Sequence, residues 1–73
     1  MTPAVFYAAC IVLWGSSQWR AEARIALKVS ERTFRRWLAG DELVPVGVVK
    51  ELVSHMAAKR DAIEAVLKAT VIE

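Results

Sequence analysis

The sequence lacks most of what enzymes and metal sites require. Its 73 residues include a single cysteine, Cys10, and a single histidine, His55. One cysteine cannot form an internal disulfide and fits a reducing cytoplasm, and one histidine without a second ligand at metal-binding spacing does not predict a zinc site. There is no glycine-rich phosphate loop, and no base–carboxylate arrangement accompanies any serine. We therefore expect neither an enzyme nor a bound cofactor.

The chain also has no apolar run long enough to cross a membrane. The longest such run extends from Ala4 to Trp14, where every residue is apolar or tyrosine, and it ends at Gly15. A transmembrane helix needs ~20 residues. A signal peptide needs a basic region ahead of its apolar segment, and the sequence has none there. The run instead predicts a helix that is buried or that a partner covers.

Charge is missing from residues 1–18 and unevenly spread over the rest. Residues 19–40 hold six basic and two acidic side chains and carry +4, whereas residues 41–73 hold four basic and six acidic side chains and carry −2. Positive charge concentrated in one segment is typical of a surface that contacts a polyanion. The alternative is that the same arginines only solvate two amphipathic helices.

What is present predicts a single small all-α domain over residues 1–73. Thr2 followed by Pro3 is typical of a helix start, and Ser30 is placed to cap a later helix with its hydroxyl. Gly40 supplies a left-handed stop and Pro45 opens the last helix. We expect four helices, near residues 3–14, 17–27, 30–39 and 45–69.

The C-terminal helix over residues 45–69 is the longest of the four. Its apolar positions follow nearly a heptad pattern, with one gap at Arg60: Val49, Val53, Met56, Ile63 and Leu67. We expect the first half to close the core. The second half either continues the same helix or follows a break near His55, and it packs on residues 3–14 or on a second copy of the chain.

The stretch from Trp19 to Gly40 holds two short apolar stripes at helical spacing, separated by a polar turn. The first stripe consists of Trp19, Ala23, Ala26 and Leu27, and the second of Phe34, Trp37 and Leu38. Neither helix is long enough to be stable alone in water, so the two must pack against each other and the rest of the chain. The outward positions of the second helix are Glu31, Arg32, Arg35 and Arg36.

This stretch resembles the helix-turn-helix of the lambda-repressor and Cro family, in the compact form of small phage and prophage regulators. The residues that match or conservatively replace the family pattern are Leu27, Val29, Ser30, Thr33, Phe34, Trp37, Leu38 and Gly40. The motif, residues 19–40, covers about a third of the chain. The resemblance implies a lambda-repressor-like fold whose helix 30–39 enters the DNA major groove.

Two residues depart from the family pattern. Lys28 stands where glycine normally allows the left-handed turn between the helices, at a cost of about 1 kcal/mol. Arg24 stands where a small alanine lets the two helices approach. We expect the aliphatic stem of Arg24 to lie along the seam, with its guanidinium in water.

The expected DNA contacts fall into two groups. Contacts to base edges are expected from the start of the reading helix and one turn on: Glu31, Arg32 and Arg36. Contacts to the sugar–phosphate backbone are expected from Gln18, Arg20, Ser30, Thr33 and Arg35. Two of these residues have an equally good structural explanation, because Glu31 favours the helix dipole and Thr33 can cap its own helix.

The sequence thus predicts sequence-specific binding of double-stranded DNA by a small cytoplasmic, nucleoid-associated transcriptional repressor. One short reading helix contacts too few base pairs for useful specificity. We therefore expect a homodimer through the N-terminal helix, the C-terminal helix or both, reading half-sites about 34 Å apart. The alternative is a helical protein-interaction module, adaptor or antitoxin-like, that uses the apolar N-terminal helix as its working surface.

Overall fold

The structure, a computed structural model, describes residues 1–72, which form four helices and no strand. In chain order the helices are α1 (Pro3–Trp14), α2 (Trp19–Leu27), α3 (Glu31–Ala39) and α4 (Val46–Ile72). The all-α prediction is confirmed. The predicted second helix began two residues too early, because Gln18 has a non-helical backbone (φ −109°, ψ 20°). The last helix is continuous and does not break near His55.

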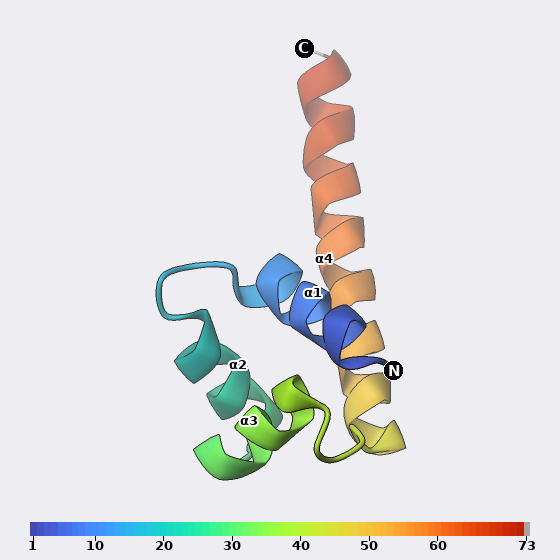
Figure 1. Cartoon of the computed structure of the whole chain (residues 1–73). Coiled ribbons are helices and arrows are strands. Elements are labelled where there is room, and N and C mark those ends of the chain that lie inside the picture. Colours follow the sequence, from blue (N-terminus) through green and yellow to red (C-terminus); the bar gives the residue numbers. More distant parts are fainter. Residues whose placement is uncertain (73) are drawn as a thin grey trace.

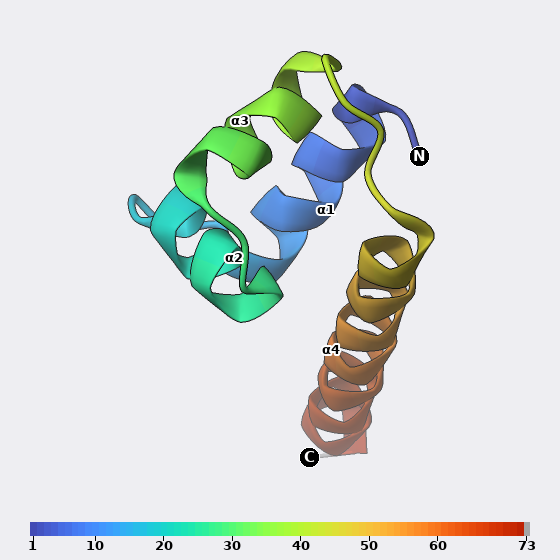
Figure 2. The same cartoon turned by 90° about the horizontal axis from the view of Figure 1, so that it is seen from below.

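The first helix is the element that the other three pack against. Figures 1 and 2 show α2 and α3 on one side of α1 and α4 crossing it on another. The side-chain oxygen of Thr2 accepts a hydrogen bond from the Val5 N–H at 3.2 Å, and Pro3 occupies the first turn, as the sequence predicted. Gly15 follows the last residue of α1, and a Cβ there would clash with the carbonyl oxygen of Ile11.

A small aromatic core joins the helices. Its fully or nearly fully buried members are Phe6, Cys10, Ala23, Leu27, Phe34, Trp37 and Leu52. The Phe6 ring meets Phe34 and Trp37 edge to face, with centroids 5.6 and 5.8 Å apart. Burying one such large side chain stabilises the fold by about 1.5–3 kcal/mol. The core therefore fixes α3 against α1 through Phe34 and Trp37, the two residues that the sequence predicted to face inward.

The first half of α4 closes this core, as expected, through a different stripe from the predicted one. Leu52 is fully buried, and Val48 and Met56 pack against the core beside it. Val53, which the heptad reading placed on the inner seam, is 55% exposed. The predicted inner face of α4 was therefore displaced by about one residue around the helix. The near-heptad spacing of the valines favoured Val49 and Val53 over the single leucine, Leu52. The second half of α4 extends past the other helices (Figure 1).

The rest of α1 is open. One face of α1 covers the core: Phe6, Ala9 and Cys10 are buried and Leu13 is half-buried. On the other faces Val5, Tyr7 and Val12 are 53, 48 and 57% exposed. A helix that is apolar on all sides is usually covered on all sides. Within residues 1–72, however, Val5, Tyr7 and Val12 remain about half exposed.

Candidate nucleic-acid interface

The turn between α2 and α3 fixes the angle at which α3 is presented. Lys28 has a left-handed backbone (φ 58°, ψ 44°), the conformation predicted for this position despite the absence of glycine. Its N–H donates to the Ile25 carbonyl at 3.2 Å, and the next N–H, of Val29, donates to the Arg24 carbonyl at 3.1 Å. These bonds satisfy the last carbonyls of α2, so the turn holds its shape although lysine is strained there.

Both ends of α3 are capped. The Ser30 hydroxyl accepts from the Thr33 N–H at 3.2 Å and lies 3.0 Å from the Thr33 hydroxyl. At the other end Gly40 is left-handed (φ 83°), and its N–H donates to the Trp37 carbonyl. A Cβ at Gly40 would lie 3.1 Å from Cγ of Pro3, so glycine fits both the backbone and the space. A nine-residue helix is thereby held as one rigid unit.

The two faces of α3 differ sharply. Phe34 and Trp37 are only 2 and 3% exposed, whereas the four charged residues predicted to face outward are all exposed: Glu31, Arg32, Arg35 and Arg36. No other segment of residues 1–72 covers this arginine face. In Figure 2, which views the molecule from below, α3 faces the viewer and α4 lies to one side of it, with its C-terminal end receding.

The predicted base-contact residues lie in two neighbouring places. Arg32 and Arg36 share the outer face of α3 with Arg35, where a shallow depression also touches Ala39 and Asp41. Glu31 lines a separate cleft between α2 and α3. The structure therefore brings Arg32 and Arg36 together and sets Glu31 apart from them.

One of the arginines has a partner within the chain. Arg36 Nε lies 3.7 Å from Glu42 Oε2, and both side chains are about half exposed. An exposed pair of this kind contributes between zero and about 1 kcal/mol. Neither Arg32 nor Arg35 forms an ion pair with any residue in 1–72. Both guanidinium groups are thus available to a ligand.

The cleft between α2 and α3 is lined by three arginines. Its volume is about 180 Å³, and its charged residues are Arg20, Arg24, Arg35 and Glu31. Arg20 also lies over the Trp19 ring, with its guanidinium carbon 5.3 Å from the centroid, which holds it beside the cleft. The predicted backbone contacts Arg20 and Arg35 are therefore brought together.

Arg24 is a member of this cleft that sequence reasoning missed as a contact. It is half-buried, which agrees with the expected position of its stem along the seam. The spacing of the arginines could have predicted this contact, because Arg20 and Arg24 are four residues apart and so share one face of α2. Three guanidinium groups around one cleft, with Glu31 as the single acidic residue of its lining, suit contacts to phosphate oxygens.

The start of α2 carries the remaining predicted contact, Gln18. The Ser16 hydroxyl accepts from the Gln18 N–H at 3.1 Å and also contacts Glu22 Oε2 at 3.4 Å. Ser16 therefore shapes the turn before the helix, and Gln18 stands at the cap position with no side-chain capping bond of its own. The Gln18 side chain, exposed to solvent on this turn, stays free to contact a ligand.

The hydroxyls of Ser30 and Thr33 are largely engaged with each other. One of the two protons is used in the bond between them, and the Ser30 oxygen also accepts from the Thr33 N–H. A hydroxyl has one proton to donate. While the bond between the two hydroxyls is kept, the pair can donate only one hydrogen bond outward.

The one cysteine, Cys10, lies in the core, away from the charged surface. Burial raises the pKa of the Cys10 thiol from 9.0 to about 11, so the thiol stays protonated and unreactive at neutral pH. Residues 1–72 hold no cluster of three or more His, Cys, Asp or Glu side chains that could bind a metal ion. The exposed arginines offer N–H groups that bind anions and other hydrogen-bond acceptors.

No helix within the described part of the chain combines the length and the apolar character that a membrane span requires. Comparison with known proteins gives no match to this chain among protein-family models, curated proteins or solved structures. The functional assignment therefore depends on the geometry of α2 and α3 and on the residues that they display.

Proposed function

We propose that this protein binds double-stranded DNA in a sequence-specific manner, with α2 and α3 acting as a helix-turn-helix and α3 entering the major groove. The observation that carries the proposal is the exposed arginine face of α3: Arg32, Arg35 and Arg36 project from a short helix that is capped at both ends. On the opposite face of the helix, Phe34 and Trp37 are buried in the core and hold the helix in place. A rigid helix with guanidinium groups on its open face has the size and chemistry to read a major groove.

Arg32 and Arg36 are the proposed base readers. The planar fork of arginine bonds the O6 and N7 atoms of guanine, and such a contact contributes about 1–3 kcal/mol of discrimination. Arg36 must leave Glu42 to make this contact. Breaking an exposed pair costs less than about 1 kcal/mol, so the exchange favours DNA. Glu31, in the first turn, accepts from cytosine N4 in this proposal and also favours the helix dipole.

The proposed backbone contacts surround α3. Arg20, Arg24 and Arg35 line the cleft between α2 and α3 and each contact a backbone phosphate around it, and Gln18 contacts a phosphate at the start of α2. Ser30 and Thr33 together supply one donor. These contacts position the protein without reading sequence. In a cell the protein would act on cytoplasmic, nucleoid-associated DNA and repress transcription by occupying a promoter.

Selection of bound sites from random duplex DNA tests this proposal. The expected result is one enriched motif that contains guanines, because two arginines are the proposed readers. Recovery of no motif, together with equal binding of all duplexes in a direct titration, would refute sequence-specific reading. The matched control is the Arg32→Ala, Arg36→Ala double variant, which is expected to bind DNA and to enrich nothing.

A protein-interaction module is the second candidate, because α1 keeps Val5, Tyr7 and Val12 about half exposed. Such a module would use this apolar face for a protein partner. Added salt distinguishes the two candidates. Binding to DNA weakens steeply with salt through counterion release, whereas an apolar protein interface changes little.

A further inference from the structure

The second half of α4 stands clear of the other helices. From Ala58 to Val71 every residue is exposed, and the large apolar side chains Ile63, Val66 and Leu67 are 57, 66 and 58% exposed. Figure 1 shows this part of the helix rising beyond α1. Isolated helices of this length are marginal in water. An uncovered apolar helix of this kind is stabilised when another surface packs on it.

The exposed apolar residues continue the stripe that already packs on α1. Leu52 and Met56 face the core, and the same face continues through Lys59 to Ile63 and Val66 in alternating steps of four and three. The Lys59 ammonium donates to the Val12 carbonyl, one of the unpaired carbonyls at the C-terminus of α1. Lys59 therefore marks the point where α1 ends and the uncovered part of the stripe begins.

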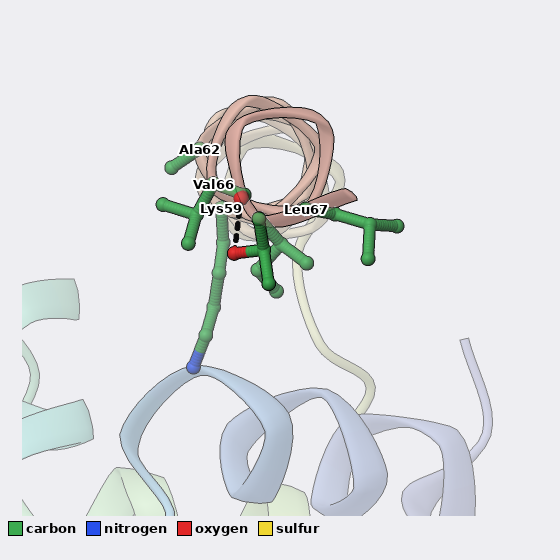
Figure 3. Close-up of a pocket in the computed structure, with 6 residues that line it drawn as sticks. Lys59, Ala62, Val66 and Leu67 are labelled. Atoms are coloured by element: carbon green, nitrogen blue, oxygen red, sulfur yellow. Dashed lines mark hydrogen bonds between the residues drawn. The ribbon is translucent and has the colours of Figure 1, made fainter. Parts of the chain in front are cut away.

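The uncovered stripe is apolar apart from its two ends. Its members form one groove along the helix: Lys59, Ala62, Ile63, Val66, Leu67 and Thr70. Thr70 donates its hydroxyl proton to the Val66 carbonyl at 2.8 Å, so this hydroxyl already has a partner within the helix. Figure 3, which views α4 along its axis, shows Lys59 reaching to α1 and Val66 and Leu67 in the turns that follow.

Charge lies off the stripe. The four charged residues of this segment on other faces are Arg60, Asp61, Glu64 and Lys68, and at 100° per residue they fall on the flank and back of the helix. This is the distribution expected of a helix with one side covered and one side in water.

We propose that residues 59–70 of α4 pair with the same residues of a second copy of this chain, in antiparallel orientation. The six stripe positions are symmetric about a point between Glu64 and Ala65. An antiparallel pair centred there sets Ile63 opposite Val66 of the second copy and Ala62 opposite Leu67 of the second copy. A small residue then faces a large one, as close packing of two helices requires.

The position of α1 argues for the antiparallel orientation. Because α1 covers the first half of the same α4 face, a parallel pair would force the two α1 helices into the space between the two α4 helices. In the antiparallel pair each α4 tip instead runs towards the Lys59–Val12 contact of the other copy. Each helix stripe is then covered over its full length, first by α1 and then by the second copy.

This dimer has a consequence that depends on the proposed function. Within one chain α3 lies at the opposite end of the molecule from the C-terminal end of α4 (Figure 1). Antiparallel pairing of the two α4 helices therefore places the two α3 helices at opposite ends of the dimer. They would lie farther apart than the ~34 Å of one DNA turn, so adjacent half-sites would not be read by one dimer.

Sedimentation velocity of the purified chain without DNA tests the dimer independently of DNA binding. Three turns of helix form a small interface, so we expect dimer to appear in the micromolar range. Val66→Glu is expected to abolish the dimer, whereas Val53→Glu, a control on the same helix with similar exposure, is expected to retain it. Circular dichroism checks that both variants keep their core helices. A monomer at about 500 µM, or a dimer that survives Val66→Glu, would overturn the proposal.

Disulfide capture tests the orientation. Ile63→Cys and Val66→Cys are made separately in a Cys10→Ala background, and one of the two carries a mass tag. In the antiparallel pair the mixed sample forms a disulfide between the thiol introduced at position 63 of one chain and the thiol introduced at position 66 of the other, because those positions face each other. Efficient linking of each variant to itself, with no preference for the mixed pair, would overturn the antiparallel register.

Discussion

Replacing Lys28 by glycine should stabilise the protein. Lys28 is the only non-glycine residue of the described chain with a positive φ, 58°, and the left-handed conformation costs a residue with a Cβ about 1–2 kcal/mol. Glycine removes that strain and loses about 0.5–1 kcal/mol because its unfolded chain is more flexible. The turn keeps its two hydrogen bonds, which come from backbone N–H groups. The net gain is therefore about 0.5–1 kcal/mol.

Thermal unfolding followed by circular dichroism measures this gain. For a domain of this size, 1 kcal/mol corresponds to about 4–8 °C, so Lys28→Gly should melt ~2–8 °C above the parent. Lys28→Ala is the matched control, because it removes the same charge and keeps the strained backbone. If Lys28→Gly melted no higher than Lys28→Ala, the strain assigned to this turn would be wrong.

Further substitutions have expected outcomes. In anisotropy titrations, Arg32→Ala should weaken binding to the selected duplex by about 1–3 kcal/mol and relax the preference at one base pair. Arg35→Ala should weaken binding to selected and random duplexes about equally. If the two variants had the same effect on both duplexes, the assigned roles would be refuted. Ser30→Ala should lower stability by about 1 kcal/mol in urea unfolding through loss of the α3 cap. Trp37→Phe should cost less than the ~3–5 kcal/mol of deleting a buried aromatic, because it also removes an N–H that has no partner among residues 1–72. Because burial holds the pKa of Cys10 near 11 against 9.0 in the unfolded chain, stability should fall as pH rises from 9 to 11, and Cys10→Ala should flatten that fall by ~2 kcal/mol.

The local rules of helix ends and turns predicted most of the fold. Thr2, Ser30 and Gly40 cap their helices as the sequence indicated, because capping depends on a few neighbouring backbone groups. The start of α2 was misplaced by two residues, because the Ser16 hydroxyl bonds the Gln18 N–H and shapes a turn there. Serine pairs cap and form turns with the same chemistry, so the sequence did not distinguish them.

The packing of α4 was less predictable. The sequence left open whether this helix is continuous or broken near His55. In the structure the ring centroids of His55 and Trp14 lie 5.8 Å apart and Lys59 donates to the Val12 carbonyl, so α4 contacts α1 at that point and one turn beyond it. Spacing alone also misassigned Val53 to the inner face. Which of two overlapping apolar stripes is buried depends on how α1 approaches, and periodicity carries no information on that approach.

For the candidate interface, the sequence predicted which residues are exposed on α3. It predicted less well how these residues lie relative to one another and to the rest of the chain. The exposure of Arg32, Arg35 and Arg36 followed from period alone. The pairing of Arg36 with Glu42 and the place of Arg24 in the cleft depend on the path of the chain after Gly40 and on the crossing of α2 and α3. Those features are set by three-dimensional packing.

The salt dependence of DNA binding tests the central claim most directly. With about three arginines on phosphate in each copy, the logarithm of the association constant for the selected duplex should fall with the logarithm of salt concentration at a slope of about −2.7 per copy. Arg35→Ala should make that slope shallower by about 0.9. No binding to any duplex at low ionic strength, or an affinity that does not change with salt, would contradict the account.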